Sequence, residues 1–249
     1  MILRRLTQSL KEQNWTAIVI EFVLLVCGVF LGTQAANWND ERQLQGRRSA
    51  ALERLHAESE ADIAYLRQRL HTLADTAPLR TEALRRLSAN DWRGADPGKM
   101  ADALDSLQLA PAMSPPQGVY DELISTGLYS ELGDPRLREA VSTYMSYVAY
   151  VQRQIDYVRA GMVARNEGRL FRGAPAVFDP QAYRQVRTVY DFPALSMDRE
   201  FVERAILNNA SMIAQVGWTT RTLAKAKAMC DEISRIDGRP CEAGDVASP

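Results

Sequence analysis

The sequence has little cysteine, little histidine and no excess charge of either sign. Its 249 residues include three cysteines and two histidines, and 30 Lys and Arg nearly balance 31 Asp and Glu. Three cysteines are too few for a fold built on disulfides. The formal charge of −1 gives no whole-chain reason to expect nucleic-acid binding. Glycine and proline, 14 and 11 in number, are too scarce for a fibrous or low-complexity protein.

Familiar catalytic motifs are also missing. The chain contains no G-x-S-x-G, no glycine-rich phosphate loop, no H-E-x-x-H and no C-x-x-C. His56 and His71 each have a carboxylate four residues further on, but two ligands on one helix face do not make a metal site. We therefore predict a non-enzymatic protein with no metal and no cofactor. The alternative is an envelope enzyme or ligand-sensing module with its site in the loops 110–118 and 173–197.

Nearly all the uninterrupted apolar sequence lies in residues 16–36, where Glu21 is the single formal charge. Twenty helical residues rise ~30 Å, about the hydrocarbon thickness of a bilayer. Trp15 and Trp38 bracket the segment, and indole side chains favour the headgroup level. We predict a transmembrane helix over residues 15–38, anchored in the lipid bilayer by both tryptophans. A cleaved signal peptide is the alternative, although its apolar region usually has only ~7–15 residues.

The basic residues beside this helix do not decide its orientation, because arginines lie on both sides. A short basic tail, residues 1–14, precedes a long domain, and long domains cross membranes with little regard to charge. We therefore expect a cytoplasmic N-terminus and an exported C-terminal domain.

Small residues recur within the predicted span. Glu21, Gly28, Gly32 and Ala35 fall within a narrow stripe of one helix face. Small side chains let two helices approach closely, and a carboxylate in a membrane needs a partner or the interface. The stripe predicts self-association or contact with another membrane protein. Alternatively, the glycines have no such role and Glu21 extends to the headgroups.

Two parts of the chain share a pattern with other bacterial sequences. The residues concerned are KEQNW at 11–15, the apolar run with its two glycines, NWNDER at 37–42, VYDELISTG at 119–127 and DPRLR at 134–138. They resemble an uncharacterised family of bacterial single-pass membrane proteins with a short basic tail, one N-terminal membrane helix and a following W-N step. The resemblance covers residues 1–60 and 119–147. It implies a protein of the bacterial inner membrane with a periplasmic or otherwise extracytoplasmic domain, and it implies no activity or ligand.

Beyond the span, apolar periodicity and proline positions predict helices and short loops. The expected helices cover residues 39–77, 79–89, 97–109 and 119–125, a long coiled-coil-like stretch that begins at Asp134-Pro135, and residues 197–236. No run of alternating β-branched residues indicates a strand. We expect an irregular segment over residues 173–197, with a short helix after Asp179-Pro180. The predicted fold is all-α, with the transmembrane helix continuing into an antiparallel extramembrane helical bundle over residues 39–236 and a flexible tail over 237–249.

Tyr147, Tyr150 and Tyr157 form a stripe along the long predicted helix. An aromatic wall of this kind is a candidate binding surface for a sugar or a peptide, because each ring offers apolar area with a hydrogen-bonding tip. The alternative is a second packing face against a neighbouring helix.

Cys230 and Cys241 are candidates for a disulfide. Gly238 allows the chain to reverse after the last helix, and Arg239 to Cys241 can then run back ~10 Å toward Cys230. A persistent disulfide requires an oxidising compartment, which agrees with an exported domain. Two unrelated thiols are the alternative. Taken together, the sequence predicts a membrane-anchored helical interaction or scaffold module of the bacterial cell envelope that binds no nucleic acid.

Overall fold

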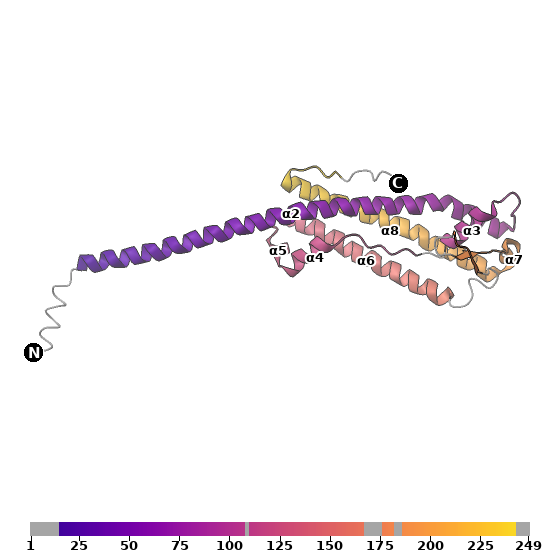
Figure 1. Cartoon of the computed structure of the whole chain (residues 1–249), viewed down its shortest axis with the longest axis horizontal. Coiled ribbons are helices and arrows are strands. Elements are labelled where there is room, and N and C mark those ends of the chain that lie inside the picture. Colours follow the sequence, from indigo (N-terminus) through magenta and orange to yellow (C-terminus); the bar gives the residue numbers. More distant parts are fainter. Residues whose placement is uncertain (1–14, 108–109, 167–175, 182–185, 243–249) are drawn as a thin grey trace, which may run out of the picture. The chain divides into compact units, whose positions relative to one another are not determined.

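The computed structural model describes residues 15–107, 110–166, 176–181 and 186–242 (Figure 1). The described residues are mostly helical, which confirms the predicted all-α class. In chain order the elements are α2 (Trp15–Ala89), α3 (Pro97–Ser106), α4 (Gly118–Ser125), α5 (Leu128–Glu131), α6 (Pro135–Asn166), β1 (Ala176–Phe178), β2 (Val186–Thr188), α7 (Phe192–Met197) and α8 (Arg199–Asp237). The predicted tail 1–14 lies outside the described residues, as does the part 243–249 of the predicted C-terminal tail.

The chain divides into two compact units, residues 1–51 and 52–249, and α2 contributes to both. In the first unit, α2 is the one described helix that is long and apolar enough to cross a membrane. Its most apolar 18-residue window has a mean hydropathy of 2.0, and no part of that window is buried. The structure therefore contains a helix that could span a membrane, as the composition of residues 16–36 predicts.

Helix α2 passes through Pro78 without interruption, so the predicted break between residues 77 and 79 is wrong. A proline inside a helix lacks one N–H donor and costs about 3 kcal/mol. Side chains nearby supply other donors: the Arg80 guanidinium donates to the Leu73 carbonyl at 3.3 Å, and the Thr76 hydroxyl donates to the Thr72 carbonyl at 3.2 Å. Arg80 also bonds to Thr76. These bonds do not reach the Ala74 carbonyl, which is the acceptor that Pro78 leaves without an N–H. Ala74 and Pro78 are exposed, so water can hydrate this carbonyl, while Leu73 and Arg80 on either side are buried.

Aspartates start four of the described helices. Asp96, Asp134, Asp191 and Asp198 each precede a helix and accept hydrogen bonds from its first backbone N–H groups. At the start of α6, Asp134 Oδ1 accepts from the N–H of Arg136 at 2.8 Å and of Leu137 at 3.1 Å. The predicted start at Asp134-Pro135 is therefore confirmed.

In the second unit α6 packs along α8, as Figure 1 shows. Seven of the eight heptad positions of α6 are buried as their spacing predicts, each at most 3% exposed: Leu137, Val141, Tyr144, Val148, Val151, Ile155 and Met162. The eighth, Val158, is half-buried. Burial of one such side chain contributes about 1.5–3 kcal/mol. The α6 stripe is therefore a large part of the core of the second unit.

Another cluster of buried residues gathers the last turns of α2, the helices α3 and α7, and the start of α8. Its members are Ala83, Leu87, Met100, Ala103, Leu104, Leu107, Tyr190, Leu195, Phe201 and Ala205. Trp92 and Phe192 pack beside it with ring centroids 4.5 Å apart, and the Trp92 indole donates to the Ser196 hydroxyl at 2.9 Å. The short helices α3 and α7 are therefore stabilised by this cluster.

Residues 173–197 differ from the sequence-based expectation. Strands β1 and β2 pair antiparallel, with Ala176 opposite Thr188 and Phe178 opposite Val186. A turn at residues 180–181, rather than the expected short helix, follows Asp179, and residues 173–175 and 182–185 lie outside the described residues. Three residues per strand are too few for a periodic pattern in the sequence, so the expectation of an irregular segment is wrong here.

Candidate functional site: a histidine beside a cysteine pair

One group of possible metal ligands among the described residues consists of His56, Cys230 and Cys241, whose ligand atoms lie within 4.8 Å of one another. His56 comes from α2, Cys230 from α8 and Cys241 from the segment that follows α8. The structure joins the two cysteines in a disulfide, with their Cα atoms 6.0 Å apart. Gly238 has a φ of 73° and ends α8, so the chain reverses where the sequence places the turn.

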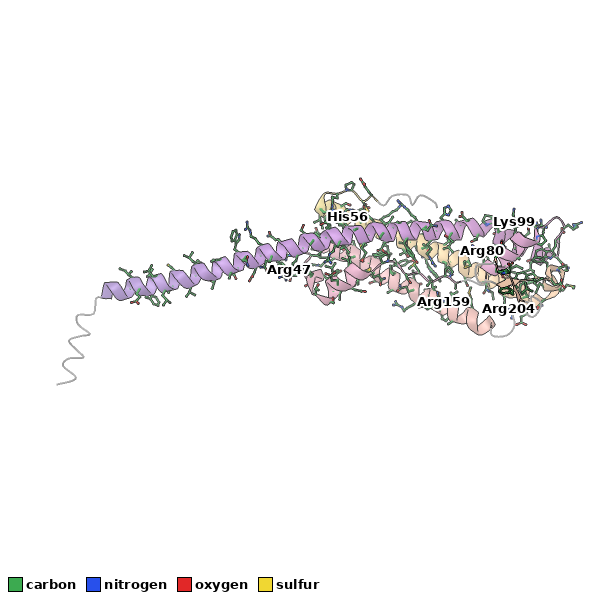
Figure 2. The ribbon with its side chains drawn as sticks, viewed as in Figure 1. Arg47, His56, Arg80, Lys99, Arg159 and Arg204 are labelled. Carbon is green, nitrogen blue, oxygen red and sulfur yellow. A yellow bond between two sulfur atoms is a disulfide. The ribbon has the colours of Figure 1, made fainter. Side chains whose placement is uncertain are left out.

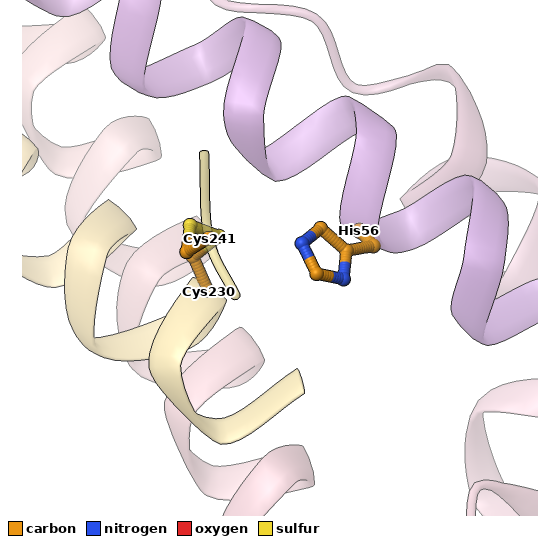
Figure 3. Close-up of side chains that lie close together, drawn as sticks. All are labelled: His56, Cys230 and Cys241. Carbon is orange, nitrogen blue, oxygen red and sulfur yellow. A yellow bond between two sulfur atoms is a disulfide. The ribbon is translucent and has the colours of Figure 1, made fainter. Parts of the chain in front are cut away.

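The His56 ring is buried and held from one side (Figure 3). Its Nδ1 atom lies 2.7 Å from Asp237 Oδ2, at the last residue of α8. A ring N–H at Nδ1 donates to this carboxylate. Figure 3 shows a ring nitrogen on the side that faces the two sulfur atoms. The Nε2 atom lies 3.5 Å from Glu60 Oε1, so both ring nitrogens have a carboxylate oxygen nearby.

Asp237 is arranged to stay ionised beside His56. Burial raises the pKa of Asp237, but hydrogen bonds from the Arg239 backbone, the His56 ring and the Arg239 side chain outweigh burial, so the pKa falls below its usual value. The Arg239 N–H and guanidinium donate to Asp237 at 3.0 and 3.1 Å. A negative charge is thus fixed behind the ring, on the side away from the sulfur atoms.

A cavity of about 460 Å³ opens beside the cluster. Its lining consists of Glu53, His56, Ala57, Glu60, Arg239, Pro240 and Glu242. Glu60 Oε1 lies 3.5 Å from His56 Nε2 and accepts the Glu242 N–H at 2.7 Å. Arg239 reaches Glu53 at 3.4 Å. The disulfide and Glu60 therefore hold residues 238–242, the described part of the tail that was predicted to be flexible.

The sequence-based reasoning missed this site because it tested each histidine only against nearby residues. His71 and Asp75 do form the expected pair at 2.7 Å on the exposed side of α2. The partners of His56 lie 174 to 185 positions away, and only the packing of α8 on α2 unites them. One signal was present: His56 and Ser59 interrupt an otherwise apolar heptad pattern, and both are buried.

The three tyrosines of the predicted aromatic wall do not share one environment, because Tyr147 faces α8 and Tyr157 faces solvent. The Tyr147 and Tyr150 rings lie 5.7 Å apart, and Lys225 of α8 lies 5.2 Å from the Tyr147 ring centroid. Tyr147 therefore faces the neighbouring helix, as the packing alternative expects. Tyr157 is 79% exposed and faces away from the core of the unit. Its role as a ligand surface stays a prediction.

The predicted anchor and contact residues belong to the first unit. Trp38 is exposed, and the Arg42 guanidinium lies 4.2 Å from its ring centroid. Trp15 is the first residue of α2, and its side chain lies outside the described residues. A Cβ added at Gly28 or Gly32 would meet no described atom within 4 Å, and Glu21 and Ala35 are exposed. The whole stripe is therefore open to a partner outside the chain.

Two arginine side chains and one glutamine side chain hold the loop 110–118 in place, and Figure 2 labels one of them, Arg159. Arg69 donates to the carbonyls of Ala112 at 2.6 Å and Pro111 at 2.9 Å. Arg159 donates to the Ala110 carbonyl, and Gln152 donates to the Met113 carbonyl. Four backbone carbonyls of this loop are thus bound by side chains of α2 and α6. The alternative of a site in this loop stays a prediction.

A second buried polar group lies deeper in the same unit. Asp62 is 1% exposed and sits near the buried Tyr144 of α6. Burial raises the pKa of Asp62 to about 7, the nearby Tyr144 hydroxyl opposes this shift, and the charge of Glu58 adds to it. Neither Asp62 Oδ1 nor the Tyr144 hydroxyl has a well-formed hydrogen bond among the described residues. Ionisation of this buried carboxyl group at high pH is therefore expected to destabilise the core.

Comparison of the chain with protein-family models, with curated proteins and with solved structures finds no match. The functional conclusion below consequently depends on the residues and contacts of this chain alone.

Proposed function

We propose that this chain is a non-enzymatic, membrane-anchored helical interaction or scaffold module of the bacterial cell envelope. The observation that carries the proposal is the apolar face of α2 in the first unit. Ten large apolar side chains between Val19 and Leu31 are 47–67% exposed. Burying one side chain of this size contributes about 1.5–3 kcal/mol, so water is a costly environment for the segment and lipid a favourable one.

The cysteine pair supports an extracytoplasmic position for the second unit. A disulfide persists in an oxidising compartment and is rare in the cytosol. With residues 1–14 in the cytoplasm and α2 crossing the inner membrane once, the second unit lies in the periplasm. This orientation also agrees with the proposed family of bacterial single-pass membrane proteins.

An antiparallel bundle is part of the proposal. The polar contacts between α2 and α8 support it, because residue numbers rise on one helix as they fall on the other. His56 contacts Asp237, Arg69 donates to Gln215 at 3.0 Å, and Arg80 donates to Asn209 at 3.3 Å. A bundle of this kind offers long helix faces to a partner.

The anchor is tested in cells that express the full chain. Alkaline carbonate washing is expected to leave the protein in the membrane pellet, because the apolar window has no protein surface to cover it. In intact cells under denaturing, non-reducing conditions, Cys230 and Cys241 are expected to resist alkylation. Release of the protein into the supernatant would refute the anchor. Free alkylation of both cysteines, with a reporter at Pro249 active only in the cytoplasm, would refute the orientation.

The interaction role is tested at the small-residue stripe. Gly28→Ile with Gly32→Ile is expected to weaken self-association in a membrane two-hybrid assay, because the added bulk holds the helix backbones apart. Neither change meets a described atom of the chain itself, so folding is unaffected. Val26→Ile with Phe30→Ile places the matched changes on the opposite helix face. An equal signal in both variants would show that the glycines do not form the contact.

A further inference from the structure

The thiol pair and the histidine have the composition of a transition-metal site. Cysteine thiolate and imidazole bind Zn²⁺ in preference to Mg²⁺ or Ca²⁺, which take oxygen ligands. The ligand atoms of His56, Cys230 and Cys241 already lie within 4.8 Å of one another in the disulfide form. We infer that reduction of the disulfide converts this cluster into a Zn²⁺ site with His56, Cys230 and Cys241 as its three protein ligands and water in the fourth position.

A small movement would bring the three ligand atoms to the spacing that a tetrahedral ion requires. Zn–S bonds of about 2.3 Å and Zn–N bonds of about 2.0–2.1 Å place neighbouring ligand atoms about 3.3–3.8 Å apart. The ligand atoms of His56, Cys230 and Cys241 lie within 4.8 Å of one another, whereas Glu60 Oε1 is outside this group and accepts the Glu242 N–H. Cys230 is at the end of a rigid helix, whereas Cys241 follows a glycine turn. The thiol of Cys241 can therefore move away from that of Cys230 once the bond between them is broken.

Asp237 completes the arrangement from behind the ring. A histidine that binds a metal through one nitrogen usually donates the N–H of the other to a carboxylate or carbonyl, which orients the ring and raises its basicity. The contact between His56 Nδ1 and Asp237 Oδ2 has this geometry at 2.7 Å. It holds the ring with a nitrogen facing the two sulfur atoms, as a metal ligand at this place requires (Figure 3).

The disulfide form and the metal-bound form differ by two electrons, so one chain cannot hold both at the same time. A dithiol reductant transfers two electrons and two protons to the disulfide, which yields two cysteine thiols, while the reductant becomes a disulfide itself. Zn²⁺ then displaces the two thiol protons to solvent and binds both thiolates. An oxidant of the disulfide class reverses the first step and releases the ion. In this scheme the oxidised chain has a disulfide and no metal, and the reduced chain has a metal bound between α2 and α8. This inference does not depend on the proposed function.

The test uses the full chain in detergent with Cys27→Ser, so that the pair supplies the only thiols. The protein is reduced with a phosphine, freed of reductant without oxygen and titrated with Co²⁺, a spectroscopic substitute for Zn²⁺. We expect one Co²⁺ per chain, with thiolate-to-metal charge-transfer bands and the intense visible bands of tetrahedral cobalt, all removed by Zn²⁺. The disulfide form should show neither. Absence of these bands in the reduced chain, or equal bands in the disulfide form, would overturn the inference.

Variants separate the ligands from their surroundings. Asp237→Asn is expected to weaken Co²⁺ binding about 10- to 100-fold, the usual effect of losing such a partner, and His56→Asn to weaken it at least as much. His71→Asn is the matched control, because His71 also has a carboxylate four residues on but lies on an exposed face. Equal affinities in the two histidine variants would refute the role of His56.

A measurement on the unaltered thiols covers the case in which a variant fails to fold. In the reduced Cys27→Ser chain, Zn²⁺ should slow alkylation of both Cys230 and Cys241 by at least about tenfold, since metal-bound thiolates are poor nucleophiles. Mg²⁺ should leave the rates unchanged. Equal rates with either ion would overturn the inference.

Discussion

Replacing Asp62 by asparagine removes a buried carboxyl group while keeping its shape. In the folded chain the pKa of Asp62 is raised to about 7, chiefly by burial, from a usual value of 3.8. Between these two pH values the folded state holds a proton that the unfolded state has released. Stability therefore falls as pH rises through this window, because deprotonation leaves a charge without solvent in the core.

The size of the effect follows from the two pKa values. One pKa unit corresponds to about 1.4 kcal/mol, so a shift from 3.8 to about 7 changes the free energy of unfolding by about 4 kcal/mol. Asparagine carries no charge at any pH and does not incur this loss. We expect Asp62→Asn to have nearly the stability of the parent chain near pH 4. At pH 8 we expect the variant to be the more stable of the two by about 4 kcal/mol.

Urea unfolding of the full chain in detergent, followed by far-ultraviolet circular dichroism between pH 4 and pH 8, measures the difference. Asp231→Asn is the matched control, because Asp231 is exposed on α8 and its replacement should leave the pH dependence of the parent chain intact. Two results would refute the reasoning. One is the same pH dependence in Asp62→Asn and the parent chain, and the other is a variant less stable than the parent at pH 8.

Two further changes test the contacts of the second unit. Arg69→Met should lower the free energy of unfolding by about 3 kcal/mol, because two loop carbonyls and Gln215 lose a charged donor. The control Arg153→Met, at an exposed position, should change the free energy of unfolding by less than about 0.5 kcal/mol. Equal losses for the two variants in the same urea assay would count against the role of Arg69 in holding the loop. Replacing Cys230 and Cys241 by serine should cost about 3 kcal/mol under oxidising conditions and much less under reducing ones, by loop entropy. A loss of equal size in both conditions would contradict a disulfide in the oxidised chain.

Much of the helical framework can be predicted from local sequence. The α6 heptads are buried where their spacing of three and four places them, because a helix turns 100° per residue and presents those positions on one side. Aspartate followed by proline marks the start of α6, since the carboxylate satisfies free N–H groups and proline lacks one. The apolar segment 16–36 likewise requires only composition and length.

Other features depend on neighbours that are remote in the sequence. The sequence around Pro78 predicts a helix end, but α2 continues because the Ala74 carbonyl that loses its donor is on an exposed turn and the residues Leu73 and Arg80 on either side are buried. The sequence around Asp62 gives no sign that its side chain is buried; the packing of α6 buries it near Tyr144. The strands β1 and β2 are too short to leave a pattern and exist only through their mutual pairing.

The sequence alone determined the all-α class, the helix that could span a membrane and the starts of several helices, because propensity, capping and periodicity act within a few residues. Only the tertiary structure decided which polar side chains meet. His56 lies on α2, the first described helix, whereas Asp237 and Cys241 lie near the end of the chain, and nothing in their local surroundings links them. They come together because α2 and α8 bury their apolar faces against the same core, and that burial brings the polar residues at the edge of the contact to one place.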